Sequence, residues 1–457
     1  MANSSIAANL LQRIQSRQAR CGVVGLGYVG LPLAVEFGRA GFVTTGIDLS
    51  ARKVDAINDG RSYIDDVPTD HVAALRRAGK LSATTNFDVV GELDTINICV
   101  PTPLGKAKDP DLSFIVSATE AVAVHLHPGM LIVLESTTYP GTTEELVQPI
   151  LERGGLKAGR DFFLAFSPER VDPGNKTFQT ANVPKVVGGM TPDCSELAAA
   201  LYGSAIQTIV PVSSPSVAEM VKLLENTFRA VNIGLVNELA LMCDRLGIDV
   251  WEVVRAAATK PFGFMPFYPG PGLGGHCIPI DPFYLSWKAR QSGFEARFIE
   301  LAGAVNGSMP HHVVSLVADA LNSICKPLNG SRVLVAGVAY KRDVDDVRES
   351  PALDILTLLR ERGAELMYSD PFVPQLPGSL WRDGIDLEHV DLASLSPGAC
   401  DCAVVVTDHS SFDYAALQRA ACVVVDTRNA IRNPGPHVFR LGAGRRAEQP
   451  IEAAALA

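Results

Sequence analysis

Residues 20–34, which read RCGVVGLGYVGLPLA, decide the fold of this chain. The apolar run through Val24 predicts a buried strand, and the glycines that follow predict a tight turn into a helix. In this spacing the first glycine permits the turn, the second lets the backbone approach a pyrophosphate, and the third lets helix and strand pack closely. The amino end of the helix would offer N–H groups to the phosphates. The predicted dinucleotide-binding residues are Gly25, Gly27, Tyr28, Val29 and Gly30.

Asp48 ends the next apolar run, where a carboxylate can accept both ribose hydroxyls and would repel a 2′-phosphate. The predicted cofactor is therefore NAD. Arg52 and Lys53 lie just beyond and keep NADP as the alternative. In a purely structural interpretation, the glycines serve packing and Asp48 is a surface cap.

Apolar strand-like runs alternate with helical patterns at both ends of the chain, which is typical of parallel sheets covered on both faces. Between them, residues 215–245 form a long helical stretch, and Asp249 with Glu252 predicts a second capped helix. The predicted fold is α/β, with two Rossmann-like doubly wound domains joined by a central helical domain. The expected ranges are 1–212 for the NAD-binding domain, 213–325 for the helical domain, 326–434 for the second α/β domain and 435–457 for a loose tail.

Composition narrows the possible functions. The 457 residues carry a formal charge of −10, and an acidic chain is a poor non-specific binder of nucleic acid. No run of 18 apolar residues predicts a membrane span, and the first twenty residues lack the apolar core of a secretion signal. The nine cysteines show no framework spacing, and Cys400 and Cys402 are too close and too isolated for a zinc site. We expect a cytoplasmic protein with no metal site.

Residues 269–282, PGPGLGGHCIPIDP, predict a rigid loop that could hold a thiolate against a ligand. A nucleophilic Cys277 needs a nearby cation or base. The long helix offers Glu219, Lys222, Asn226 and Arg229, whose intervals of three, four and three residues place them on one face. Taken alone, the helix pattern is the usual one of a solvated helix face, and Cys277 is as compatible with a buried structural thiol as with a nucleophile.

Seven segments together are similar to the UDP-glucose/GDP-mannose dehydrogenase family. They are residues 23–34, 98–104 (ICVPTPL), 135–145 (ESTTYPGTTEE), 166–174 (FSPERVDPG), 218–240, 269–285 and 337–356 (GVAYKRDVDDVRESPALDIL). The resemblance extends from residue 20 to about residue 433. It implies that C6 of a nucleotide sugar is oxidised twice, from alcohol to carboxylate, with two NAD⁺ and an enzyme thioester.

The resemblance also implies residue roles. Cys277 is the nucleophile, Lys222 and Asn226 stabilise charge on the reacting oxygen, and Asp281 positions or deprotonates water. Glu169 is the base for thioester hydrolysis, although which carboxylate moves the proton stays open. Thr137 contacts both the nicotinamide region and a catalytic water, and Thr102 joins the cofactor site. The implied substrate contacts are Arg170, Val171, Lys222, Asn226, Arg229, Gly274, Tyr340, Lys341 and Arg348, with Arg428 a weaker candidate and His276 either a sugar contact or a packing residue.

The cysteine loop resembles the branch of the family that acts on UDP-N-acetylhexosamines. It has His276 and Ile280 where plain UDP-glucose dehydrogenases usually have Ser and Lys. The expected substrate is therefore UDP-N-acetylglucosamine, oxidised to its uronate for surface polysaccharide synthesis. UDP-N-acetylmannosamine and UDP-glucose stay as alternatives, as do a non-catalytic nucleotide-sugar sensor and a two-electron 3-hydroxyacid-type dehydrogenase. In the family, the long helix after Ser214 forms a dimer interface, so we expect a homodimer.

Overall fold

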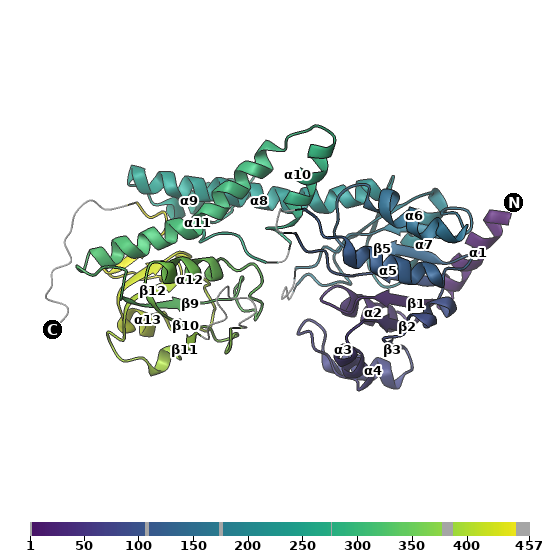
Figure 1. Cartoon of the computed structure of the whole chain (residues 1–457), viewed down its shortest axis with the longest axis horizontal. Coiled ribbons are helices and arrows are strands. Elements are labelled where there is room, and N and C mark those ends of the chain that lie inside the picture. Colours follow the sequence, from purple (N-terminus) through teal and green to yellow (C-terminus); the bar gives the residue numbers. More distant parts are fainter. Residues whose placement is uncertain (1, 106–108, 173–176, 276, 377–386, 445–457) are drawn as a thin grey trace. The chain divides into compact units, whose positions relative to one another are not determined.

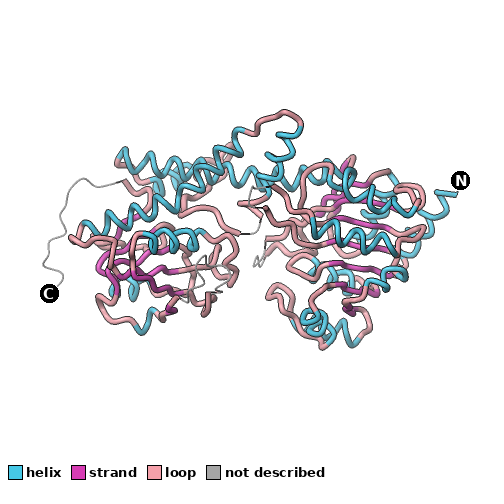
Figure 2. Tube along the Cα trace, viewed as in Figure 1, coloured by secondary structure: helices cyan, strands magenta, loops and turns pink. Residues whose placement is uncertain are grey.

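A computed structural model describes residues 2–105, 109–172, 177–275, 277–376 and 387–444 of the chain. It divides into two compact units, one formed by residues 1–225 and 283–294 and the other by residues 226–282 and 295–457. Strands with helices packed around them make up the core of each unit (Figure 2).

The first unit is built on an eight-stranded sheet in the order β3-β2-β1-β4-β5-β6-β7-β8. Figure 1 labels β1, β2, β3 and β5 of this sheet. All neighbouring strands run parallel except β6 and β7, which are antiparallel. The first six strands have the order 3-2-1-4-5-6 of a dinucleotide-binding fold, so this part of the prediction is confirmed. The strands are β1 (Arg20–Val24), β2 (Val43–Ile47), β3 (Leu81–Thr84), β4 (Thr95–Ile98), β5 (Leu131–Leu134), β6 (Phe163–Phe166), β7 (Lys185–Gly189) and β8 (Ile209–Val212).

Helices cover both faces of this sheet because its strands are apolar on both sides. In β5, Leu131 and Val133 join one core, and Ile132 and Leu134 join the other. The first core contains α1 (Ala2–Gln15), α2 (Gly30–Arg39), α3 (Ala51–Asn58), α4 (Thr69–Arg77) and α7 (Pro192–Gly203). The second contains η1 (Phe87–Glu92), α5 (Ser113–Val124), η2 (Thr143–Val147) and α6 (Gln148–Leu151), which continues into η3 (Glu152–Gly154).

The second unit contains a six-stranded parallel sheet in the order β11-β10-β9-β12-β13-β14, which repeats the strand order of the first. Its strands are β9 (Arg332–Ala336), β10 (Glu365–Ser369), β11 (Glu388–His389), β12 (Cys400–Val405), β13 (Ala421–Asp426) and β14 (Val438–Arg440). Helices α11 (Arg297–Asn322) and α12 (Pro351–Glu361) pack on one face, and η5 (Leu392–Ser394) and α13 (Tyr414–Ala420) on the other. The expected second Rossmann-like domain is therefore present.

The central part of the chain is helical, as the sequence predicts. Helix α8 (Pro215–Leu246) ends at Gly247, whose positive φ of 71° breaks the helix. The Asp249 carboxylate accepts hydrogen bonds from the backbone N–H groups of Trp251 and Glu252 and so caps α9 (Val250–Ala257). Helix α10 (Asp281–Gln291) follows the cysteine loop.

The expectation of a loose tail from residue 435 is wrong for its first part. Val438–Arg440 forms β14, which pairs with β13, and the Leu441 side chain is fully buried. The Trp251 indole N–H also donates to the Leu441 carbonyl oxygen at 2.7 Å. A three-residue edge strand has too few residues to show a sequence period, which is why the pattern missed it. Residues 445–457 lie outside the described residues.

None of the described helices is both long and apolar enough to cross a membrane.

Candidate active site

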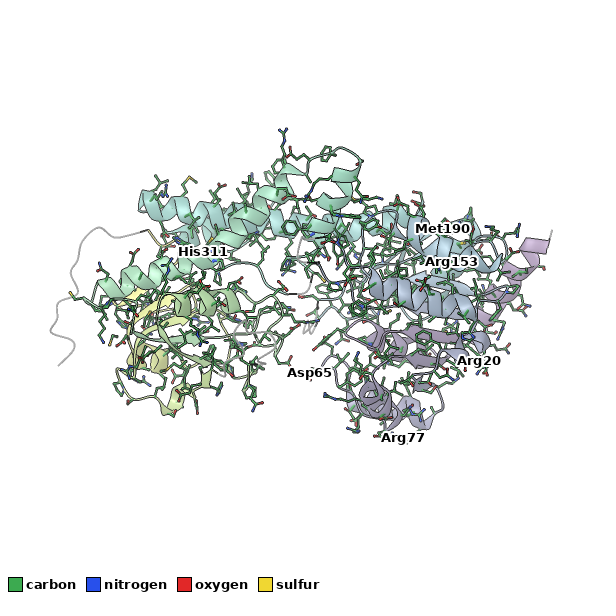
Figure 3. The ribbon with its side chains drawn as sticks, in the orientation of Figure 1. Arg20, Asp65, Arg77, Arg153, Met190 and His311 are labelled. Atoms are coloured by element: carbon green, nitrogen blue, oxygen red, sulfur yellow. The ribbon has the colours of Figure 1, made fainter. Side chains whose placement is uncertain are left out.

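The glycine turn of the first unit has the geometry that its spacing predicts. Arg20, labelled in Figure 3, begins β1, so the turn after Val24 lies at the carboxyl edge of the sheet. A Cβ on Gly25 (φ 89°) would lie 2.7 Å from the Cys99 carbonyl oxygen, and one on Gly30 only 1.8 Å from that of Gly25. A Cβ on Gly27 would meet no atom within 4 Å. The backbone at Gly27 is therefore open to a phosphate, and the turn fits a dinucleotide.

Asp48 holds the glycine turn in place through hydrogen bonds. Its carboxylate accepts hydrogen bonds from the N–H groups of Leu26 (2.8 Å) and Ser50 (2.9 Å) and from the Lys53 ammonium (2.9 Å). Partial burial opposes ionisation, but these donors outweigh it and lower the pKa of Asp48. The ionised carboxylate keeps acceptor capacity for a ribose hydroxyl, because a carboxylate has about four acceptor positions.

The other predicted cofactor residues belong to the same unit. Tyr28 and Arg52 are exposed, and Val29 is half-buried immediately before α2. Thr102 is buried after β4, and its carbonyl oxygen accepts a hydrogen bond from the Tyr284 hydroxyl. Thr137 is half-buried after β5.

A buried ionic cluster holds Glu169. The Lys185 ammonium lies 2.6 Å from a Glu135 oxygen and 3.1 Å from Glu169 Oε2, while the N–H groups of Arg170 and Val171 donate to Glu169 Oε1. Burial disfavours the charge of Glu169, but Lys185 and the backbone donors outweigh it and lower its pKa. Glu169 is thus held as an anion. Sequence reasoning missed Lys185 and Glu135, although a lysine opening an apolar run was a visible signal.

Glu219 and Lys222 do not form the simple helix-surface pair that their spacing allows. The Glu219 carboxylate instead accepts hydrogen bonds from the Gly141 N–H and from the N–H and hydroxyl of Thr143. Burial raises the pKa of Glu219 to about 7 against the effect of these donors. Glu219 therefore anchors the segment that contains Thr137 on α8, a role that the sequence analysis did not assign.

Lys222 is only 8% exposed, and the described residues provide no hydrogen-bond or ion-pair partner for its ammonium group. A cation at a largely buried position is stabilised when a ligand supplies the opposite charge. Lys222 is therefore suited to stabilise negative charge on a bound substrate. Further along α8, Arg229 is exposed to solvent.

Arg170 is engaged within the first unit. Its guanidinium lies 2.6 Å from Glu225 of α8 and also donates to the Pro184 carbonyl oxygen. Val171 uses its N–H to hold Glu169. Both residues therefore shape the surroundings of Glu169, in addition to any contact they make with substrate.

In the second unit, Cys277 lies four residues before the first residue of α10. Its carbonyl oxygen accepts hydrogen bonds from the N–H groups of Ile280 (3.0 Å) and Asp281 (2.8 Å). Asp281 is buried, and its carboxylate accepts a hydrogen bond from the Asn226 side-chain amide. His276 lies outside the described residues.

The predicted substrate residues of the second unit come together around the cysteine loop. A Cβ on Gly274 would lie 2.8 Å from the Tyr340 Cβ, and the Gly275 N–H donates to the Arg348 carbonyl oxygen at 3.2 Å. The Arg348 guanidinium is held by Asp346 at 2.6 Å. Lys341 is half-buried next to Tyr340. The loop thus packs directly on the turn that follows β9.

Arg428 also contacts this loop. A Cβ on Gly270 would lie 2.7 Å from an Arg428 guanidinium nitrogen, and Arg428 Nε donates to the Val406 carbonyl oxygen. Burial lowers the pKa of Arg428. The weaker candidate thus lies against the same segment as the stronger ones.

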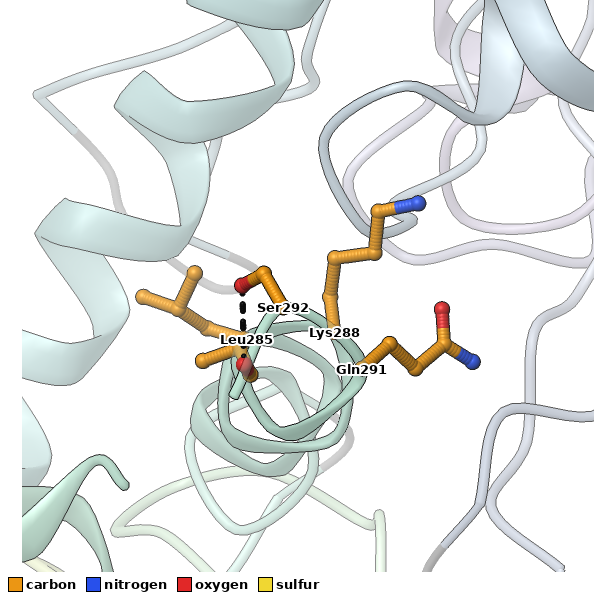
Figure 4. Close-up of a pocket in the computed structure, with 5 residues that line it drawn as sticks. Leu285, Lys288, Gln291 and Ser292 are labelled. Carbon is orange, nitrogen blue, oxygen red and sulfur yellow. Dashed lines mark hydrogen bonds between the residues drawn. The ribbon is translucent and has the colours of Figure 1, made fainter. Parts of the chain in front are cut away.

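A surface depression of about 440 Å³ lies elsewhere, on α10. In Figure 4, Lys288 and Gln291 extend from the side of the helix opposite Leu285, and the Ser292 hydroxyl donates to the Ala289 carbonyl oxygen at 2.9 Å. Residues of α10 and Ser292, which follows it, line the depression, and none of the predicted site residues does. We assign it no role.

The predicted residues therefore fall into two groups, each at the carboxyl edge of a dinucleotide-type sheet or on the segments beside it. The first unit holds Gly25, Gly27, Tyr28, Val29, Gly30, Asp48, Arg52, Lys53, Thr102, Thr137, Glu169, Arg170, Val171 and Lys222. The second holds Asn226, Arg229, Gly274, Cys277, Asp281, Tyr340, Lys341 and Arg348. Such a pair of folds defines an α/β enzyme that uses a dinucleotide.

Comparison with known proteins identifies the class. Residues 19–206, 216–308 and 334–433 match the NAD-binding, central and UDP-binding domains of the UDP-glucose/GDP-mannose dehydrogenase family. The UDP-N-acetyl-D-glucosamine 6-dehydrogenase of Pseudomonas aeruginosa is 38% identical over 87% of this chain and 92% of its own length. The UDP-N-acetyl-D-mannosamine dehydrogenase of Pyrococcus horikoshii is 34% identical over 93% of this chain and 99% of its own. A solved structure of UDP-D-ManNAc dehydrogenase from that organism superposes with a TM-score of 0.84, at 32% identity over 93% of this chain and 99% of that one.

The chain belongs to the UDP-glucose/GDP-mannose dehydrogenase family. It is an oxidoreductase, an NAD-dependent UDP-sugar dehydrogenase. The predicted fold class, cofactor and enzyme class are confirmed.

Proposed function

We propose that this enzyme oxidises UDP-N-acetylglucosamine at C6 to UDP-N-acetylglucosaminuronate, for surface polysaccharide synthesis. The 38% identity to the Pseudomonas aeruginosa enzyme of that specificity carries this choice. UDP-N-acetylmannosamine is the second candidate, because a relative that acts on it matches 93% of the chain.

In the proposed mechanism, Cys277 is the nucleophile. The glycine turn and Asp48 would hold NAD⁺, which would supply the hydride acceptor for both oxidations. The Cys277 thiolate adds to the C6 aldehyde to form a thiohemiacetal, whose oxidation gives a thioester. The ammonium group of Lys222, a residue that is only 8% exposed, stabilises negative charge on the C6 oxygen, and loss of one such donor typically costs about 10²–10³ in rate.

Hydrolysis of the thioester needs a base for water. Glu169 takes this proton in our proposal, and its ionised state supports that role. Asp281, held by Asn226, orients the loop that carries Cys277 and the attacking water. Arg348, Lys341 and the turn after β9 bind the diphosphate and sugar, and the packing of Gly274 on Tyr340 supports this assignment.

The stoichiometry of NADH tests the proposal. Purified protein receives limiting UDP-N-acetylglucosamine, UDP-N-acetylmannosamine or UDP-glucose in parallel. We expect two NADH per UDP-N-acetylglucosamine and little from the other two. A better rate with the manno epimer selects the second candidate. One NADH per sugar would indicate a two-electron dehydrogenase, and none from any sugar would indicate a sensor.

We also infer a homodimer. Helix α8 exposes Leu224, Phe228, Leu235, Met242 and Leu246, whose intervals of four and seven residues form one apolar stripe. Light scattering should give twice the chain mass, and a monomer at micromolar concentration would refute the inference. A cytoplasmic location stays a prediction from the cysteine pattern.

The division into ranges 1–212, 213–325 and 326–434 is likewise a proposal. Each of the three matched family regions falls within one of these ranges, which supports it. Limited proteolysis should cut first near residues 213 and 326, and early cuts inside the ranges would contradict the division.

A further inference from the structure

The buried cluster around Lys185 contains two charged groups for which the proposed chemistry has no use. The side chains of Glu135 and Lys185 are 0% and 4% exposed, and that of Glu169 is 13% exposed. Burying three charged groups is expensive unless each is paired and hydrogen-bonded. Here both carboxylates share one ammonium group, so the cluster is fully connected.

The reversed strand β7 explains how Lys185 reaches Glu169. In the antiparallel pairing with β6, Phe166 lies opposite Gly188 and Ala165 opposite Gly189. Continuing this register places Lys185 opposite residue 169, beyond the carboxyl end of β6. A parallel β7 would carry its first residue to the other edge of the sheet. The strand reversal therefore delivers a lysine to the edge where the catalytic residues lie.

Glu135 is the fixed end of the cluster. Its Oε1 accepts hydrogen bonds from the Tyr202 hydroxyl (2.6 Å) and the Asn97 amide (2.9 Å), and its Oε2 binds Lys185. These donors come from α7, β4 and β7, so the carboxylate is held from three elements. Lys185 is thereby anchored at its inner side, and Glu169 is the most exposed of the three groups.

The charges around Glu169 come from every element packed against it. They are Lys185 on β7, Glu135 after β5, Cys99 after β4, Tyr202 on α7, and Arg170 on its own loop paired with Glu225 of α8. Burial raises the pKa of Cys99 and that of Tyr202, so both are neutral at working pH. Burial opposes the charge of Lys185, but Glu135 and Glu169 outweigh it and raise its pKa. Lys185 is therefore the cation that keeps Glu169 ionised.

We propose that Lys185, anchored by Glu135, is a positioning residue that holds Glu169 in place as an anion for hydrolysis of the Cys277 thioester. This inference rests on the proposed function. In the step concerned, the water oxygen bonds to the thioester carbon, a water proton passes to Glu169, the carbon–sulfur bond breaks and sulfur leaves as the Cys277 thiolate. The oxidations that precede it do not use Glu169, so they should not depend on Lys185.

The two partners of Glu169 should act in opposite directions. In Lys185→Met the attraction between the ammonium group and the Glu169 carboxylate is lost, so Glu169 binds its proton more tightly. The acid limb of the pH–rate profile for hydrolysis, where the rate falls as Glu169 is protonated, should therefore move to higher pH by about one unit or more. In Glu135→Gln the ammonium group interacts with Glu169 alone, so the acid limb should move down by about half a unit. A purely structural cluster would lower activity in both variants without shifting the limb in opposite directions.

The hydrolysis step is isolated by rapid mixing with saturating NAD⁺ and UDP-N-acetylglucosamine. At pH values on this acid limb, Lys185→Met should release two NADH per site in a burst and then turn over more slowly than the wild type, by about tenfold for each pH unit of the shift. Intact-protein mass should show the uronyl adduct on Cys277. Lys185→Arg should restore part of the rate, because it keeps the charge. Lys157→Met, which removes an exposed ion pair with Glu152, is the matched control and should behave as the wild type.

Ionisation is also measured without activity, from the protonated-carboxyl infrared band that disappears in Glu169→Gln. This band should titrate at higher pH in Lys185→Met and at lower pH in Glu135→Gln. If Lys185→Met does not fold, the shift in Glu135→Gln decides. If neither the acid limb of the pH–rate profile nor the infrared band shifts in these variants, the inference is overturned. Two NADH per sugar from the wild type would still support the proposed function in that case. Conversely, a wild type that forms no NADH refutes the function, while shifted bands still show that Lys185 controls Glu169.

Discussion

The two sheets of this enzyme share a strand order but use the same aspartate position differently. Asp48 follows β2 and Asp370 follows β10, each after the second strand of its sheet. Asp48 is partly exposed and accepts hydrogen bonds from two backbone N–H groups and Lys53. Asp370 is 1% exposed and accepts them from His409 and from the N–H groups of Val338, Ala339, Phe372 and Val373.

This difference separates a carboxylate that has capacity for a ligand from one that the protein uses entirely for its own structure. The acceptor positions of Asp370 are taken by the protein, so no ribose can bind there. Its partner His409 accepts the Asp343 N–H at Nδ1, which places the ring proton on Nε2, toward Asp370. The second sheet therefore uses its aspartate to build the turn after β9, whereas Asp48 keeps capacity for a cofactor. The strand order that the two sheets share therefore does not determine which ligand each one binds. The hydrogen-bond partners of the aspartate in each sheet determine whether it can bind a ligand.

The largest effect is expected from Cys277→Ser, which separates chemistry from both ligand sites. A serine hydroxyl is a far weaker nucleophile than a thiolate, so turnover should fall by about 10³-fold or more. Calorimetry should find NAD and UDP binding within about twofold of the wild type, because phosphate contacts are untouched. Retention of full steady-state turnover would refute the thioester mechanism.

Asp370→Asn tests the structural half of the comparison. It turns an amide N–H toward buried donors, so the free energy of unfolding should fall by about 3 kcal/mol by denaturant titration. UDP binding should weaken with it, and NAD binding should stay unchanged. Asp48→Asn is the matched control and should cost less stability, since water can reach the site. An equal loss of unfolding free energy in Asp370→Asn and Asp48→Asn would contradict the structural role assigned to Asp370 alone.

The pH dependence of this loss follows from the pKa of Asp370. Burial opposes ionisation, but His409 and the backbone donors outweigh it and lower the pKa of Asp370. The stabilisation is therefore fully present above the ordinary pKa of about 3.8 and is lost as the pH falls through the lower folded value. The stability difference between wild type and Asp370→Asn should be constant above that pH and shrink below it. A difference that grows in acid would contradict the assignment.

Asp48→Ala tests the ligand-binding half. Loss of the ribose acceptor should raise the KM for NAD by about tenfold to thirtyfold and relax discrimination against NADP. Initial rates with each cofactor measure both effects. An unchanged preference would show that Asp48 only holds the glycine turn, as Asp370 holds its own.

The sequence predicted those features that depend on neighbouring residues. The glycine spacing, the apolar strands, the stop at Gly247 and the Asp249 cap are local, and the structure contains each of them. Lys185 and Glu135 are 50 residues apart and meet only because β7 is reversed, which no local pattern shows. Glu219 pairs with Thr143 from a distant segment instead of with its helix neighbour Lys222, and no local pattern shows this contact either.

The smallest effect is expected from Asp249→Ala, which compares the thermal unfolding of the two units. Asp249 caps α9 and binds Arg440 of β14, and all three belong to the second unit. Loss of an N-cap typically costs about 1 kcal/mol, so Asp249→Ala should lower one unfolding temperature by about 2–4 °C. If the two units unfold as separate cooperative blocks, calorimetry should shift one transition and leave the other in place. A joint shift of both would mean that the two sheets, despite their different uses, unfold together.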